Sequence, residues 1–310
     1  RDAQESRGLG DVYKRQILPI GFIAPLMRVG KYSEQFNMVK ACLDQIREFI
    51  EKPELSRPEK NAVLDETAYR FENVSFAYNE TEVLKNVSFE IKPCTVSAIV
   101  GPSGSGKSTI AKLMAGFWDA TKGEVIFGGK NIKEIPFAQL MGEVSYVAQD
   151  NFLFDESIRE NIRLGKPDAT DDEVVAAAKA ACCHDFIVNL ENGYDTMIEG
   201  DGANLSQGQR QLLNIARAAI SKAPVLILDE ATSSVDTRTE VRIQKAMDNL
   251  MTGRTSFVIA HSLSTIKDAD LILVMKDGDI IEQGNHEELL SKKGFYADLY
   301  NSQFENKATA

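Results

Sequence analysis

The spacing of apolar residues changes its character near Tyr69. Before that point, six apolar residues alternate by four and three positions: Tyr32, Phe36, Val39, Leu43, Ile46 and Ile50. This is the heptad spacing of a helix with one apolar face. Pro53 and Pro58 then interrupt the pattern within a charged stretch, residues 51–65. The pattern predicts a helix that ends near residue 52, followed by a linker over residues 53–68.

From residue 69 onward, short apolar runs alternate with stretches of helical periodicity. Arg70–Phe76 and Val87–Ile91 show the alternation of strands that pair in antiparallel fashion. Further runs are apolar throughout, as in buried strands of a parallel sheet: 95–100, 144–148, 225–229 and 255–260. Strands over 271–275 and 279–283 predict a hairpin. Residues 151–220 are mostly helical, so the sequence predicts an α/β fold with an antiparallel β subdomain and an inserted α-helical subdomain.

The first buried run leads into a segment that fits the motif G-x-x-x-x-G-K-[ST]. Its members are Gly101, Pro102, Ser103, Gly104, Ser105, Gly106, Lys107, Ser108 and Thr109. In this motif backbone N–H groups surround phosphate oxygens, while Lys107 reaches the β and γ phosphates and the Ser108 hydroxyl ligates Mg²⁺. The helix that follows directs its positive end at the same place. The segment predicts a phosphate-binding loop, and the alternative is a glycine-rich turn that binds nothing.

A second chemical signal is the end of the apolar run at residues 225–228. Asp229 and Glu230 follow it, at the carboxyl edge of the predicted sheet, where ligands of such folds bind. Asp229 is expected to hold Mg²⁺, as phosphoryl-transfer sites require, and Glu230 to polarise the attacking water. The alternative is a structural strand that ends in a solvated acidic pair.

The third signal is a helix start at Ser206. Gln209 lies three residues on, which makes a capping box, and Gly208 between them leaves room for a phosphate near the helix N-terminus. The segment Leu205–Gln209 resembles the signature motif, L-S-G-G-Q, of ATP-binding cassette (ABC) ATPases. Gln207 stands where the first glycine of that motif is usual.

The resemblance to ABC ATPases covers residues 69–303 and implies further roles. Tyr78 matches the aromatic residue that stacks on adenine, and Gln149 the glutamine that contacts Mg²⁺ and the attacking water. His261 matches the switch histidine at the γ phosphate, and residues 233–236 resemble the loop that communicates across the dimer. The resemblance therefore implies a P-loop NTPase core with Lys107, Gln149, Glu230 and His261 as catalytic residues and ATP and Mg²⁺ as cofactors. A second ABC half, from the same or a different chain, is expected to pair head to tail, so that Ser206, Gly208 and Gln209 serve the nucleotide of the partner.

The N-terminal part predicts a junction with a membrane. Residues 1–16 are polar and aperiodic, which indicates an artefact or a disordered tail. Ile17–Met27 is apolar but shorter than the roughly 20 residues that cross a bilayer. We expect residues 17–52 to be the truncated end of a transmembrane domain, namely its last helix with a cytoplasmic extension, and the alternative is a soluble helical cap. The ATPase domain is expected over residues 69–305, with a tail over 306–310.

The net charge and the cysteine spacing indicate which partners and which cysteine chemistry to expect. The net charge of −11 argues against a nucleic-acid partner. The four cysteines show no C-x-x-C spacing, which predicts free thiols.

The resemblance is to the half of an exporter at the cytoplasmic face of the plasma (inner) membrane, with transmembrane helices as partners and a lipophilic substrate. The alternative is a stand-alone ATPase subunit of an importer.

Overall fold

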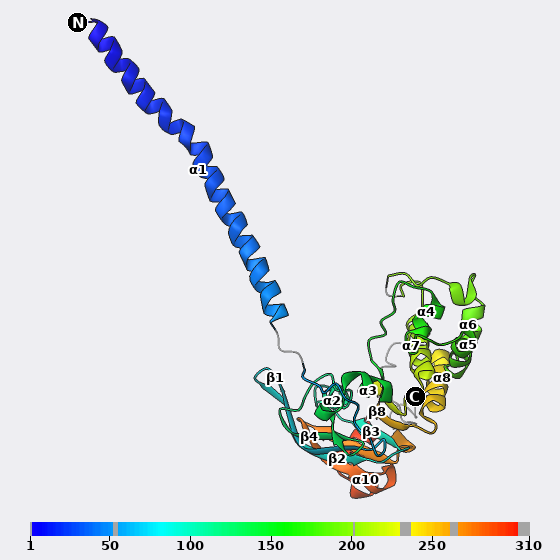
Figure 1. Cartoon of the computed structure of the whole chain (residues 1–310). Helices are drawn as coiled ribbons and strands as arrows, with labels where there is room; N and C mark the ends of the chain where they lie inside the picture. Colours follow the sequence, from blue (N-terminus) through cyan, green and yellow to red (C-terminus); the bar gives the residue numbers. More distant parts are fainter. Residues whose placement is uncertain (1, 52–54, 201, 230–236, 261–265, 303–310) are drawn as a thin grey trace. The chain divides into compact units, whose positions relative to one another are not determined.

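The computed structural model describes residues 2–51, 55–200, 202–229, 237–260 and 266–302 (Figure 1). The chain separates into two units, Arg1–Leu55 and Ser56–Ala310. The first unit contains helix α1, Asp2–Ile50, with Pro19 and Pro25 inside it. The helix runs through residue 16 without a break, so the expected division between 1–16 and 17–52 does not appear in the secondary structure. The origin of residues 1–16 stays a prediction.

The apolar face predicted on the first unit is present in α1. Side chains of the heptad positions are exposed: Phe36 by 74% and Ile50 by 74%. A helix of this kind is stable in a protein mainly when its apolar face packs against another element. Within the first unit, the apolar side chains of α1 are exposed. No helix in the described part of the chain is both long and apolar enough to cross a bilayer.

The second unit contains a four-stranded antiparallel sheet. Its strands are β1 (Tyr69–Tyr78), β2 (Thr81–Ile91), β4 (Lys122–Phe127) and β5 (Lys130–Asn131), in the order β2-β1-β4-β5. Alternate residues of β1 and β2 point inward, and Phe71 stacks on Phe89 with ring centroids 4.4 Å apart. Such cross-strand aromatic pairs fix the register. The predicted antiparallel β subdomain is therefore confirmed.

A six-stranded sheet forms the centre of the same unit. Its strands are β3 (Val96–Val100), β6 (Val144–Val147), β7 (Val225–Asp229), β8 (Thr255–Ile259), β9 (Leu271–Lys276) and β10 (Asp279–Gly284), in the order β10-β9-β3-β8-β7-β6. All neighbours are parallel except β10, which pairs antiparallel with β9 as the predicted hairpin. The parallel strands are buried on both faces, which explains their continuous apolar runs.

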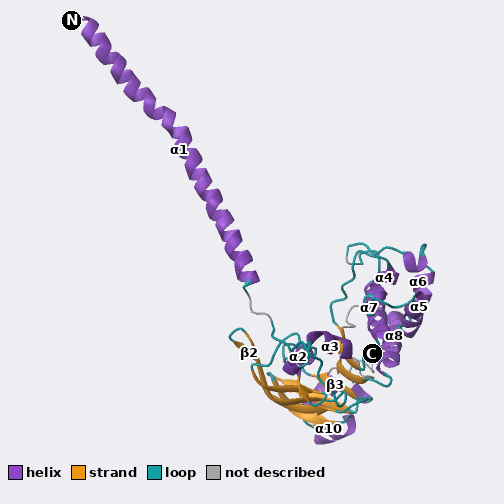
Figure 2. Ribbon diagram, viewed as in Figure 1, coloured by secondary structure: helices purple, strands orange, loops and turns teal. Residues whose placement is uncertain are grey.

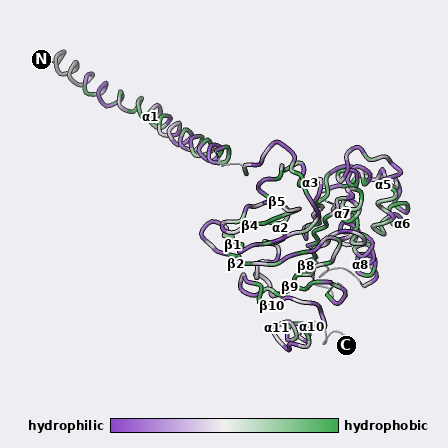
Figure 3. The backbone as a smooth tube through the Cα atoms, turned by 60° about the horizontal axis from the view of Figure 1, so that its bottom comes forward, coloured by the Kyte–Doolittle hydropathy of each residue, from purple (hydrophilic) through white to green (hydrophobic). Residues whose placement is uncertain are grey.

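Helices cover the central sheet and form a separate group beside it (Figure 2). The helix bounds are α2 Lys107–Met114, α3 Phe137–Glu143, α4 Ile158–Arg163, α5 Asp171–Ala180, α6 His184–Val188, α7 Gln207–Ser221, α8 Thr237–Met251, α10 His286–Lys292 and α11 Phe295–Tyr300, with short 3-10 turns at Ile132–Glu134 and Gly193–Asp195. Helices α4 to α7 make the helical subdomain that the sequence predicts. Figure 3 shows hydrophobic positions gathered along α7 and β8. The buried apolar side chains of α7 share one core with Val258 of β8, and this core joins the helical subdomain to the sheet.

The segment before β1 is part of the second unit rather than a free linker. Gln139 on α3 binds the backbone of Ala62 through both ends of its amide, at 2.8 and 2.9 Å. Leu64 packs against the core around β1. The second unit therefore begins at Ser56, thirteen residues before the boundary expected from the sequence (69 minus 56). Pro53 and Pro58 predict a linker because proline marks the end of a helix. The start of the packed unit is decided instead by contacts with residues far along the chain, which the positions of the prolines do not reveal.

Candidate functional site

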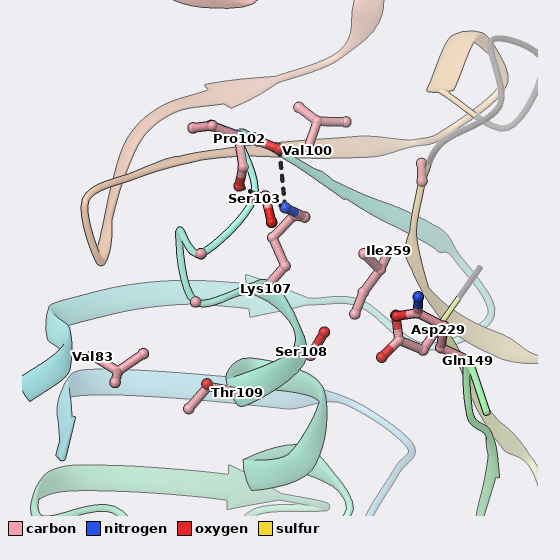
Figure 4. A pocket seen from close by; sticks show the side chains of 14 residues that line it. Val83, Val100, Pro102, Ser103, Lys107, Ser108, Thr109, Gln149, Asp229 and Ile259 are labelled. Atoms are coloured by element: carbon pink, nitrogen blue, oxygen red, sulfur yellow. Dashed lines mark hydrogen bonds between the residues drawn. The ribbon is translucent and has the colours of Figure 1, made fainter. Parts of the chain in front are cut away.

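A cavity of about 420 Å³ opens at the carboxyl ends of the central strands. Residues at or just after the ends of β3, β6, β7 and β8 meet there because parallel strands share one edge. Its lining, drawn in Figure 4, consists of Val83, Val100, Gly101, Pro102, Ser103, Gly104, Gly106, Lys107, Ser108, Thr109, Gln149, Asp229, Ile259 and Ala260. The structure thus brings together most of the phosphate-loop residues with Gln149 and Asp229.

The phosphate loop takes a conformation that requires glycine at its turn into α2. Gly106 caps the N-terminus of α2 with φ of 104°, in the left-handed region. A Cβ there would lie 2.8 Å from Cδ2 of Leu84, so a side chain would be strained in its backbone conformation and would displace Leu84. Lys107, Ser108 and Thr109 begin the helix and line the cavity, which places its positive end at the site. Ser105 differs from its neighbours, since its side chain is buried within the loop.

Lys107 carries its positive charge next to two carbonyl oxygens of the phosphate loop. Its Nζ donates hydrogen bonds to the carbonyl oxygens of Gly101, at 2.9 Å, and Pro102, at 2.8 Å (Figure 4). Burial lowers the pKa of Lys107, and the carboxylate of Asp229 opposes that shift. An ammonium group in this position can attract the phosphates of a nucleotide, as phosphate loops do.

Three oxygen-bearing side chains around the cavity fit a magnesium ion. Ser108 offers a hydroxyl, Gln149 an amide oxygen and Asp229 a carboxylate, and all three line the same cavity. Mg²⁺ prefers oxygen ligands and usually takes one or two carboxylates together with phosphate oxygens of a substrate. The donor set therefore fits the ion that the sequence predicts at these residues.

Tyr146 supports Asp229 and was missed by the sequence reasoning. It lies on β6, and its hydroxyl is 3.4 Å from Oδ2 of Asp229. Burial and the nearby carboxylate raise the pKa of Tyr146 well above its usual value, so the phenol stays protonated and can donate. In the sequence, Tyr146 looked like an ordinary strand residue, because nothing in a single strand shows which neighbouring strand it will face.

Tyr78 lies at the end of β1 and does not line the cavity. It packs edge-on against Phe76 and Trp118, with ring centroids 4.8 and 5.5 Å away. The sequence reasoning did not single out Trp118, which is 46% exposed beside Tyr78. Adenine stacking by Tyr78 stays a prediction.

The signature residues are on a different element from the phosphate loop. Ser206 caps α7: its Oγ accepts from the backbone N–H of Gln209 at 3.3 Å, while Oε1 of Gln209 accepts from the backbone N–H of Ser206 at 2.8 Å. The predicted capping box is therefore confirmed. Ser206, Gly208 and Gln209 do not line the cavity around Lys107. Glu230, His261 and residues 233–236 lie outside the described residues.

Comparisons with known proteins agree with this geometry. Residues 84–233 match the family model described as ABC transporter. An uncharacterized ABC transporter ATP-binding protein of Bacillus subtilis is 45% identical over 280 residues, which is 88% of this chain and 46% of that protein. An ATP-dependent lipid A-core flippase of Syntrophus aciditrophicus is 47% identical over 75% of this chain and 39% of its own length.

A solved structure is similar as well. It is a bacterial Atm1-family ABC exporter with ATP bound, which is 39% identical, covers 86% of this chain and 47% of its own, and has a TM-score of 0.79. The chain thus spans less than half the length of the relatives it matches. With the phosphate loop, the acidic strand end and the capped signature helix in family order, this chain belongs to the ABC transporter family.

Proposed function

We propose that this chain binds ATP with Mg²⁺ in the cavity around Lys107 and hydrolyses it to ADP and phosphate. The observation that carries the proposal is the meeting of Lys107, Ser108, Gln149 and Asp229 around one cavity at the carboxyl edge of the sheet. Bound Mg²⁺ would neutralise charge on the β and γ phosphates. Ser108, Gln149 and Asp229 are the residues that would hold the ion.

Other residues of the chain are proposed to orient the nucleotide and to activate the attacking water. Lys107 and the N-terminus of α2 orient the phosphates and favour the negative charge that develops on them. Tyr78 is proposed to hold adenine, at the far end of the β subdomain. Glu230 is proposed to accept a proton from the attacking water, and His261 to contact the γ phosphate.

We further propose that the domain works as one half of an exporter. A head-to-tail pair explains why a capped helix N-terminus at Ser206 lies apart from the cavity of its own chain: it would contact the nucleotide of the partner. The relatives named as a lipid flippase and an exporter favour export over import. In that role the domain lies at the cytoplasmic face of the plasma (inner) membrane, beneath transmembrane helices, and its substrate is lipophilic.

The first test is Mg²⁺-dependent ATP hydrolysis by the chain and by its Lys107→Ala variant. The variant loses the charged contacts to two phosphates, so we expect hydrolysis to fall at least about a hundredfold and ATP affinity to fall as well. Phosphate release and equilibrium binding measure the two effects. Lys112→Ala, which changes a lysine on the same helix that does not line the cavity, is the matched control. Hydrolysis by Lys107→Ala at the parent rate would remove the phosphate-loop assignment.

A further inference from the structure

An arginine near the start of the second unit is buried in an ion pair. Nη2 of Arg57 lies 2.7 Å from Oδ1 of Asp119, and Nη1 lies 3.1 Å from Oδ2. The Arg57 side chain is only 5% exposed and that of Asp119 24%. Burial of an arginine costs free energy unless the partner geometry is good, and a segment that merely connected two units would leave this side chain in water. The bidentate pair therefore indicates a specific attachment.

The partner, Asp119, closes a three-residue run that begins shortly after the phosphate-loop helix α2. Trp118, next to it, packs edge-on against Tyr78 at 5.5 Å. Phe117 packs edge-on against Tyr146 at 5.4 Å. The hydroxyl of Tyr146 in turn donates to Asp229. Residues 117–119 thus contact the segment before β1, the proposed adenine aromatic and Tyr146, which in turn binds the carboxylate proposed for Mg²⁺.

We propose that Arg57 is a positioning residue, which holds residues 117–119 so that Trp118 keeps Tyr78 oriented for the purine ring of the nucleotide. This rests on the proposed function, because it assumes that ATP binds with adenine at Tyr78. Arg57 is the second residue of the unit that begins at Ser56. The ion pair therefore attaches the first residues of the segment from Ser56 to residue 68 to the rest of the unit. The pair links the conformation of that segment to purine binding.

Trp118 provides a direct measurement, because it is the sole tryptophan of the chain. In the full chain, Arg57→Met is compared with the parent for tryptophan emission and for the affinities of Mg–ATP and Mg–tripolyphosphate, which lacks the purine. We expect a shifted emission spectrum without ligand, and a KM for ATP raised about threefold to tenfold, the size of one misplaced aromatic contact. The kcat is expected to change by less than about twofold, because base contacts are the same in ground and transition states. Tripolyphosphate affinity is expected to stay at the parent value.

Two further variants separate positioning from general stability. Arg70→Met removes an exposed ion pair to Glu72 in the same unit, with side chains 54% and 45% exposed, and is expected to behave as the parent. Arg57→Lys keeps the charge but cannot form two parallel hydrogen bonds, so it is expected to resemble Arg57→Met. If Arg57→Met does not fold, the double variant Arg57→Met/Asp119→Asn replaces it, since it leaves no unpaired charge, and the same selective loss for ATP is expected.

The outcomes are distinct. Parent-like emission and parent-like ATP affinity in the Arg57 variants would overturn the proposal. Equal weakening of ATP and tripolyphosphate would also overturn it, because it would show a merely structural role. If the parent itself binds neither ligand, the proposed nucleotide site fails, and that failure is visible before any variant is measured.

Discussion

Lys107 shows how the local fold adjusts a single side chain for its task. Its ammonium is surrounded by loop carbonyls that accept its hydrogen bonds, while burial weakens its hold on the proton and Asp229 strengthens it. Lys107 thus lines the cavity with its ammonium bound to carbonyl groups and not to a carboxylate. The buried pair of Arg57 and Asp119 is the contrasting case, in which a cation serves attachment.

Glu230 supplies the prediction that isolates proton transfer. In Glu230→Gln the amide has the shape of the carboxylate but cannot accept the proton of water. ATP hydrolysis is expected to fall roughly 10²–10⁴-fold, the usual contribution of a general base, while ATP binding is retained. Single-turnover phosphate release and a binding titration measure the two properties. Gel filtration with ATP and Mg²⁺ is expected to show more dimer for the variant than for the parent, because ATP stays in place. Unchanged turnover would mean that another group activates the water.

At the scale of elements, two helices of the helical subdomain begin with the same device. Helix α5 has a capping box from Thr170 to Glu173, and α7 has one from Ser206 to Gln209. A capping side chain contributes about 1 kcal/mol to helix stability. The two caps are thus equivalent in local physics, and only the one on α7 is proposed to face a nucleotide.

This pair of helices offers a controlled prediction. Ser206→Ala and Thr170→Ala are each expected to lower the free energy of unfolding by about 1 kcal/mol, measured by urea denaturation. ATP hydrolysis is expected to fall about tenfold in Ser206→Ala only, because the lost hydroxyl would contact phosphate of the partner subunit's nucleotide. Equal activities of the two variants would contradict the role of α7 at a shared site.

At the scale of the whole molecule, the boundary between the units decides which truncation is tolerated. The segment from Ser56 to residue 68 is attached through Arg57 to Asp119, Ala62 to Gln139 and Thr67 to Thr255. Helix α1 instead exposes its apolar side chains. From the sequence alone, the ATPase domain is expected to begin at residue 69 after a linker, whereas these contacts include residues 56–68 in the second unit.

Two deletions test the boundary. Removal of residues 1–55 is expected to leave the unfolding free energy of the ATPase unit within about 0.5 kcal/mol and to improve solubility, because an exposed apolar face is lost. Removal of residues 1–68 is expected to destabilise the unit by on the order of 3–5 kcal/mol, since Asp119 loses its partner. Denaturation midpoints and ATPase rates of both deletions provide the comparison. Equal stability of the two would show that residues 56–68 do not pack as part of the unit.

Residues adjacent in the sequence determine much of the fold and of the candidate site. The phosphate loop, the capping box at Ser206 and the buried strand ending at Asp229 are read from residues adjacent in sequence, because turn geometry, helix capping and strand burial depend on near neighbours. The parallel sheet followed from runs that are apolar on both faces. Family resemblance then added Tyr78, Gln149 and His261: Gln149 lines the cavity, Tyr78 does not, and His261 lies outside the described residues.

Only the tertiary structure decided which distant residues support the site. Tyr146 reaches Asp229 across 83 positions, and Arg57 reaches Asp119 across 62. Neither pair has a spacing or a periodicity that marks it, because strand order and loop packing choose the partners after the elements have formed. For the same reason, nothing in the sequence marks Trp118 as a neighbour of Tyr78 or Ser56 as the start of the second unit. Local chemistry sets what each segment can do, and packing between segments sets which of them act together.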